Sequence, residues 1–272
     1  MSYLNNFHYR ITGDKNKPKL VFLHGLMGFA NNWRSIAKHF ERDFEILCLD
    51  QRGHGRSFHP ESGYSPEDYA EDLRKIIDEL GWAKIHLVGH SMGARNSHCF
   101  SHNNSHRLSS LVLEDLGPEA DPQALLRNQE LIDRVGAPFE NKNHARAHIE
   151  REFKDEMTLG EYFYANLTQK EGEDGGYVDW RFSLKGIIES VEAGRNTSRW
   201  NEIESIQCPC LLIRGELSED LSRETYEKML KSNTKLRGVE IEGARHWVHF
   251  DRQKEFISVL KEFYVEQSLM SF

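Results

Sequence analysis

Short apolar runs alternate with amphipathic segments along most of the chain. The apolar runs are rich in Val, Ile and Leu, which favours β-strands. They are Lys19–Leu23, Glu45–Asp50, Lys84–Gly89, Ser109–Glu114, Cys210–Arg214 and Leu236–Ile241. Near-continuous apolar runs are typical of parallel strands that are buried on both faces. The pattern therefore predicts a mostly parallel sheet.

The best-marked helix is predicted over residues 66–80. Ser65 is a suitable N-cap, Pro66 occupies the first helical position and Asp68 completes an acidic capping box. Apolar residues then recur at helical spacing until Gly81, which ends the helix. Strands that alternate with such helices indicate an α/β fold with a doubly wound sheet.

One long segment interrupts this alternation. The chain between Glu114 and Cys210 far exceeds the dozen or so residues of an ordinary crossover, and its charges and aromatic residues are interleaved. We expect residues 118–203 to form an inserted helical cap, or lid. Residues 1–117 and 204–272 would then form one discontinuous core. The Gly-rich stretch 171–176 is a candidate hinge within the cap.

Charge and composition exclude several classes of protein. The 272-residue chain has 43 acidic and 35 basic residues, a net charge of −8 that argues against nucleic-acid binding. Neither an apolar run long enough to span a membrane nor a secretory signal is expected, so a cytoplasmic protein is predicted. The four cysteines are expected to be reduced thiols. A zinc site at Cys208 and Cys210 is the alternative, but a second pair of cysteines at zinc-ligand spacing is missing.

A candidate nucleophile lies directly after the third predicted strand. Residues 89–93 read Gly-His-Ser-Met-Gly, a G-x-S-x-G pentapeptide between a strand and a helical segment. This context is what a nucleophile elbow requires, because Ser91 must occupy a strained turn with small residues on both sides. The backbone N–H of Met92 would then face the space where an oxyanion forms.

A second oxyanion donor is expected after the first predicted strand, where residues 24–28 read His-Gly-Leu-Met-Gly. The N–H of Leu26 is the first choice and that of Met27 is the fallback. His24 is expected to hold this loop in place rather than to transfer protons.

The serine needs a base, and His246 has the most suitable position. It follows the last predicted strand, which places it at the same edge of the sheet as Ser91. His249 is expected to be structural, and a metal site is not expected because no acidic ligand motif accompanies the two histidines.

The residues alone leave the acid partner of His246 open. Asp115 directly follows one strand, whereas Glu216, Glu219 and Asp220 follow the next. Asp50, in the loop after an earlier strand, is a weaker candidate. Any of these carboxylates would lie near the carboxyl edge of a parallel sheet.

Four motifs in this order resemble the α/β-hydrolase superfamily of serine hydrolases: HGLMG, DQRGHGRS, GHSMG and ARHWVHF. The resemblance covers residues of about 3–117 and 204–272, and the inserted segment matches a cap only in position and helical character. Many members place the acid in a G-x-x-D pattern, where this chain has Ser218. YbfF-type bacterial esterases, which the chain also resembles, place it at the position of Asp115. The resemblance thus implies the triad Ser91, Asp115 and His246, with Asp220 as the runner-up.

A serine nucleophile implies acyl transfer without a metal or an organic cofactor. The resemblance suggests a carboxylesterase for small or medium acyl esters, with acyl-CoA thioesters as further substrates. Met27, Phe29 and Trp247 are candidates for the substrate pocket. Alternatives are a C–C bond hydrolase, lactonase, perhydrolase or lyase, or a non-catalytic ligand receptor. The net charge disfavours highly anionic substrates unless basic residues of the cap gather at the entrance, and the oligomeric state stays open.

Overall fold

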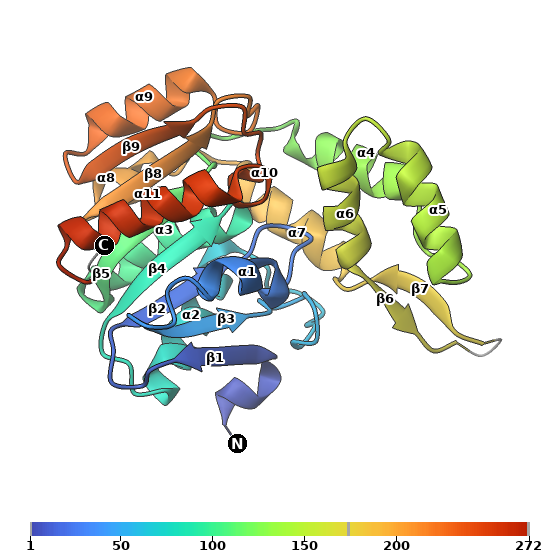
Figure 1. Cartoon of the computed structure of the whole chain (residues 1–272), viewed down its shortest axis with the longest axis horizontal. Coiled ribbons are helices and arrows are strands. Elements are labelled where there is room, and N and C mark those ends of the chain that lie inside the picture. Colours follow the sequence, from blue (N-terminus) through green and yellow to red (C-terminus); the bar gives the residue numbers. More distant parts are fainter. Residues whose placement is uncertain (1, 173–174, 271–272) are drawn as a thin grey trace.

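The computed structural model describes residues 2–172 and 175–270. Its centre is a seven-stranded sheet in the order β1-β3-β2-β4-β5-β8-β9 (Figure 1). The strands are β1 (Tyr9–Gly13), β2 (Lys19–Leu23), β3 (Glu45–Leu49), β4 (Ile85–His90), β5 (Leu108–Glu114), β8 (Cys210–Gly215) and β9 (Leu236–Ile241). All neighbouring pairs are parallel except β1 with β3. The predicted α/β fold with a mostly parallel sheet is confirmed.

The sequence pattern located every parallel strand but missed β1. This strand has the sequence Tyr-Arg-Ile-Thr-Gly and lies at the edge of the sheet, where its residues are exposed or half-buried. A strand in that position has no need of a continuous apolar run, which was the signal used to find the others.

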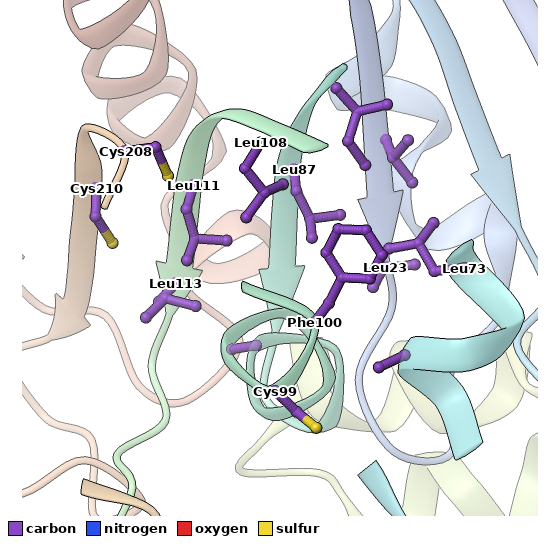
Figure 2. Close-up of a cluster of buried hydrophobic side chains, with 14 of the residues drawn as sticks. Leu23, Leu73, Leu87, Cys99, Phe100, Leu108, Leu111, Leu113, Cys208 and Cys210 are labelled. Carbon is purple, nitrogen blue, oxygen red and sulfur yellow. The ribbon is translucent and has the colours of Figure 1, made fainter. Parts of the chain in front are cut away.

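Helices cover both faces of the sheet. One face packs against α1 (Arg34–Ala37) and α11 (Gln253–Glu266). The other packs against α2 (Pro66–Glu79), α3 (Met92–Asn104), α8 (Trp200–Glu204) and α9 (Arg223–Ser232). Figure 2 shows part of the second interface, where leucines of β2, β4 and β5 lie opposite Leu73 of α2 and Phe100 of α3. This burial fixes α3 against the strand that precedes it.

Helix α2 begins as its sequence predicts. The Oγ of Ser65 accepts a hydrogen bond from the N–H of Asp68 at 3.2 Å, and Oδ2 of Asp68 accepts one from the N–H of Ser65 at 3.0 Å. These two bonds satisfy backbone donors that the first helical turn leaves free.

Most of the chain between β5 and α8 forms a separate group of elements beside the sheet (Figure 1). It contains α4 (Ala124–Val135), α5 (Lys142–Glu152), α6 (Met157–Ala165), β6 (Leu167–Lys170), β7 (Tyr177–Trp180) and α7 (Leu184–Arg195). Its buried aromatic and aliphatic residues form an apolar cluster of their own, which Met27 and Trp247 of the core also join. The elements of this group are helices except for the antiparallel β6–β7 pair.

The predicted hinge, residues 171–176, falls between β6 and β7, and residues 173–174 lie outside the described part of the chain. The hinge therefore stays a prediction.

Shorter elements complete the described fold. They are the 3-10 segments η1 (Tyr3–Asn6), η2 (Ala30–Trp33) and η3 (Ser105–Arg107), and the short helix α10 (Val248–Asp251). Within the described ranges, each helix is too short or too polar to cross a membrane.

Candidate functional site

Ser91 lies at the sharp turn between β4 and α3. Its backbone has φ 52° and ψ −117°, which is a strained conformation for a residue with a side chain. A Cβ on Gly89 would lie 2.3 Å from the carbonyl oxygen of Gly93, and a Cβ on Gly93 would lie 2.4 Å from that of Leu23. Both positions therefore require glycine for a steric reason, as the pentapeptide predicts.

Asp115 and His246 form a hydrogen-bonded pair. Nδ1 of His246 lies 2.8 Å from Oδ2 of Asp115, whose side chain is fully buried. The carboxylate also accepts hydrogen bonds from the N–H of Gly215 at 2.9 Å and from the hydroxyl of Ser218. These donors hold the carboxylate in one orientation, so it can fix the tautomer and direction of the imidazole ring.

Asp220 also lies beside His246, but in a more exposed position. Its Oδ2 is 3.5 Å from Nδ1 of His246, and its side chain is 36% exposed. Burial disfavours the charged imidazole, but the carboxylates of Asp220, Asp115 and Glu114 outweigh this effect and raise the pKa of His246 to about 9. The two candidate acids thus differ in kind: Asp115 makes the hydrogen bond, and Asp220 adds negative charge.

A cavity of about 370 Å³ lies at this edge of the sheet. Ser91 and His246 both line it, since both follow carboxyl ends of parallel strands. Of the predicted pocket residues, Met27 and Trp247 also line the cavity. Phe29 is not among its lining residues in the described chain, and its ring lies 5.0 Å from the Arg181 guanidinium.

Two backbone segments with the expected oxyanion donors also line the cavity. Met92 is the first residue of α3, so its N–H has no partner within the helix. The loop that carries Leu26 turns sharply, because the N–H of Gly28 donates to the carbonyl of Gly25 at 3.1 Å and Met27 adopts φ 62°. From α6, the hydroxyl of Tyr162 donates to the carbonyl of Leu26 at 3.3 Å, which helps to hold this loop.

His24 and Asp50 connect loops outside the cavity lining. Nε2 of buried His24 accepts a hydrogen bond from the N–H of Gln51 at 3.0 Å, and its Nδ1 lies 2.8 Å from the carbonyl of Gly25. Asp50 accepts backbone hydrogen bonds from Ala30 at 2.8 Å and from Arg56 at 2.9 Å. These contacts agree with a structural role for both residues.

His90, Glu114 and His249 form a second buried group of titratable side chains near His246. The sequence analysis missed Glu114. Glu114 accepts hydrogen bonds from the N–H of His249 and from its Nδ1, both at 2.8 Å. Nε2 of His90 lies 3.0 Å from the carbonyl of His246. His90, Glu114 and His249 lie close enough to share a metal ion, whereas the sequence analysis considered only His246 with His249 and expected no metal site. Glu114 ends an apolar strand, so nothing in its local pattern distinguished it.

The four cysteines have free thiols and are buried. Cys99, Cys208 and Cys210 belong to the apolar core between the sheet and α3 (Figure 2). Burial raises the pKa of Cys99 to about 12. Burial of this kind is typical of structural cysteines, and Cys99 also lies close to the carboxylates of Glu67 and Glu202.

Comparison with known proteins finds relatives whose sequences align with nearly the whole chain. A Haemophilus influenzae protein provisionally named an esterase/lipase is 27% identical over 96% of this chain and 88% of its own length. Esterase YbfF of Escherichia coli is 25% identical over 91% of this chain and 93% of its own. Among solved structures, E-2-(acetamidomethylene)succinate hydrolase superposes with a TM-score of 0.84 at 24% identity, covering 95% and 94% of the two chains.

The family model for the alpha/beta hydrolase fold matches residues 18–253, which include the segment between β5 and β8. That match spans most of the chain and includes the residues around the cavity. The chain therefore belongs to the α/β-hydrolase family, and its esterase- and lipase-named relatives support a hydrolase.

Proposed function

We propose that this protein is a serine carboxylesterase that cleaves small or medium acyl esters, with acyl-CoA thioesters as a second substrate class. One observation carries the proposal. Ser91 lies on a strained turn and lines the same cavity as His246, whose ring is held by the buried carboxylate of Asp115. This combination is what nucleophilic acyl transfer requires.

In the proposed reaction, Nε2 of His246 takes the proton from Oγ of Ser91, and this oxygen attacks the ester carbonyl carbon. The N–H groups of Met92 and Leu26 stabilise the negative charge on the carbonyl oxygen. The imidazolium then protonates the leaving alcohol or thiol as its bond to the carbonyl carbon breaks. Water, deprotonated by His246, hydrolyses the acyl-enzyme and restores Ser91.

Asp115 acts through His246. Its carboxylate accepts the Nδ1 proton, so that Nε2 faces the nucleophile as an acceptor, and it stabilises the imidazolium that forms during the reaction. No step needs a metal or an organic cofactor.

Residues 118–203 would act as a cap over the cavity, because Leu131 and Val191 of this segment line it beside Ser91. We propose a cytoplasmic location.

The test is a panel of 4-nitrophenyl esters and acyl-CoA thioesters of graded chain length, with Ser91→Ala as the blank. The intact enzyme should show turnover and Ser91→Ala should lose it by at least a thousandfold. A fluorophosphonate probe should add its mass to Ser91, and not to the alanine variant. Turnover that survives in Ser91→Ala would remove Ser91 from the nucleophile role. Labelling without turnover of any ester would favour another serine-dependent reaction, such as C–C bond hydrolysis, lactone opening or elimination.

A further inference from the structure

Arginines gather around the cavity, and most of them already have acidic partners. Arg127 and Arg195 both form ion pairs with Asp121. Arg134 forms an ion pair with Glu156 at 2.6 Å. These three come from the segment between β5 and β8, and their positive charge is offset by carboxylates within that segment.

Arg95 is different, because it comes from the core and has no acidic partner among the described residues. It lies in the first turn of α3, and its N–H donates to the carbonyl of Ser91 at 3.0 Å. Arg95 lines the cavity although the residue is only 4% exposed. Nη2 donates to the hydroxyl of Ser190 at 2.9 Å, and the buried Nε has no hydrogen-bond partner among the described residues. Within the same residues, no carboxylate lies within 4.0 Å of the guanidinium.

The guanidinium is held in place by α7. A Cβ on Gly194 of that helix would lie 2.2 Å from Cζ of Arg95 and 2.3 Å from its Nε and Nη1. Only glycine leaves room for the guanidinium here. Contact with Gly194 and the hydrogen bond to Ser190 therefore fix its orientation before any ligand arrives, which reduces the entropy that binding must overcome.

A buried cation without an anion is unfavourable in a folded protein. Burial, together with the positive charges of Arg195 and Arg199, lowers the pKa of Arg95 to about 9. The side chain is therefore still charged at neutral pH. An anion in the cavity beside the guanidinium would neutralise this charge.

We propose that Arg95 binds a carboxylate of the substrate, so that the preferred substrate is an ester with a carboxylate a few bonds from its scissile carbonyl. This inference rests on the proposed esterase function. A guanidinium presents its N–H donors in a planar fork that matches a carboxylate. Arg95 lies about one helical turn after Ser91 and both residues line the same cavity, which favours a short spacing such as that in a glutarate half-ester.

Pairs of ester substrates that differ only in a carboxylate or an amide test whether Arg95 binds a substrate carboxylate. Monoethyl glutarate is compared with ethyl 4-carbamoylbutanoate, and 4-acetoxybutanoate with 4-acetoxybutanamide, so that the carboxylate lies on the acyl or the alcohol side. In at least one pair, the intact enzyme should have a kcat/KM about ten- to a hundredfold higher for the acid, as expected for a hydrogen bond to a charged group. Arg95→Met should abolish this preference and Arg95→Lys should keep part of it.

Arg151→Met is the matched control, because Arg151 is an exposed cap arginine that pairs with Glu152 and does not line the cavity. It should keep the preference of the intact enzyme. Equal rates for acid and amide in both pairs, or an unchanged preference in Arg95→Met, would overturn the assignment.

A binding measurement separates this inference from the esterase proposal. Glutarate should raise the melting temperature of Ser91→Ala, and glutaramide should not. Adding Arg95→Met to Ser91→Ala should remove the glutarate effect, whereas adding Gly194→Ala should weaken it by displacing the guanidinium. An equal rise with inorganic phosphate would contradict a carboxylate site. If no ester is turned over but glutarate still stabilises through Arg95, the esterase proposal fails and the carboxylate site stands.

Discussion

The hydroxyl of Ser218 donates a hydrogen bond to Oδ2 of Asp115, the oxygen that also faces Nδ1 of His246. Ser218 occupies the position where many α/β-hydrolases carry their acid, in the loop after β8. In this chain the carboxylate that contacts His246 directly follows the neighbouring strand β5, and it accepts hydrogen bonds from Ser218 and from the N–H of Gly215 at the end of β8. The end of β5 therefore provides the carboxylate, and the end of β8 with its following loop provides the hydrogen-bond donors that hold it.

Replacing each candidate acid separately tests which one orients His246. Asp115→Asn should lower kcat by several powers of ten, because an amide at this position favours the wrong imidazole tautomer. Asp220→Asn should retain far more activity, since Asp220 lies 3.5 Å from Nδ1 and is partly exposed. Steady-state kinetics on one ester at one pH are sufficient. The reverse order of the two effects would make Asp220 the triad acid.

The pH dependence of kcat/KM should report the charge around His246. The base must be neutral to accept the serine proton, and its pKa is raised to about 9, so activity should rise with pH through the alkaline range. In Asp220→Asn the imidazolium loses a neighbouring negative charge, so the rising limb should move to lower pH. A profile that stays in place in this variant would show that Asp220 does not influence the base.

Ser218→Ala should weaken catalysis without abolishing it. The variant removes one donor from a buried carboxylate, and hydrogen bonds to charged groups contribute about 1.5–3 kcal/mol. We expect kcat to fall by about tenfold and the melting temperature to drop by several degrees. Ser222→Ala, which removes the N-cap of α9, is the control because it should lower stability and leave kcat unchanged. A wild-type kcat in Ser218→Ala would show that Asp115 needs no help from this loop.

The close approach at Gly93 predicts a steric effect on Ser91. Gly93→Ala would place a Cβ 2.4 Å from the carbonyl of Leu23, so it should destabilise the protein by a few kcal/mol and abolish turnover. Gly81→Ala is the control, because a Cβ there meets nothing within 4 Å and only the positive φ of 70° costs about 1 kcal/mol. Chemical denaturation and ester turnover measure both effects. Normal activity in Gly93→Ala would contradict the described turn.

Buried neutral histidines should make the fold sensitive to acid. Burial lowers the pKa of His24 to about 4 and that of His54 to about 3. Both remain neutral in the folded protein while the unfolded chain binds protons below about pH 6.5, so stability should fall as the pH drops from 6.5 toward 4. His54→Gln should reduce the slope of unfolding free energy by up to about 1.4 kcal/mol per pH unit. The exposed residue His106 provides the control His106→Gln, and equal slopes in the two variants would refute the assignment.

Local signals in the sequence determined the sheet, helix α2 and the turn at Ser91. Buried parallel strands need continuous apolar runs, a capped helix start needs Ser65 and Asp68, and a strained turn needs glycines at 89 and 93. Each of these requirements acts within a few residues, so it is visible in one sequence. The half-exposed strand β1 and the β6–β7 pair have weaker local patterns, and they were missed for that reason.

Only the tertiary structure decided which side chains meet across strands and across the cap. The pairing of Asp115 with His246 joins residues 131 positions apart, and the proximity of Glu114 to His249 joins residues 135 apart. The fit of Arg95 against Gly194 depends on how α7 packs over α3. Such contacts join residues that are far apart in the sequence and depend on how the elements pack, so no periodicity or local motif encodes them. The sequence therefore determined the fold and the candidate nucleophile, whereas packing decided which carboxylate contacts His246, which donors support it and which charges line the cavity.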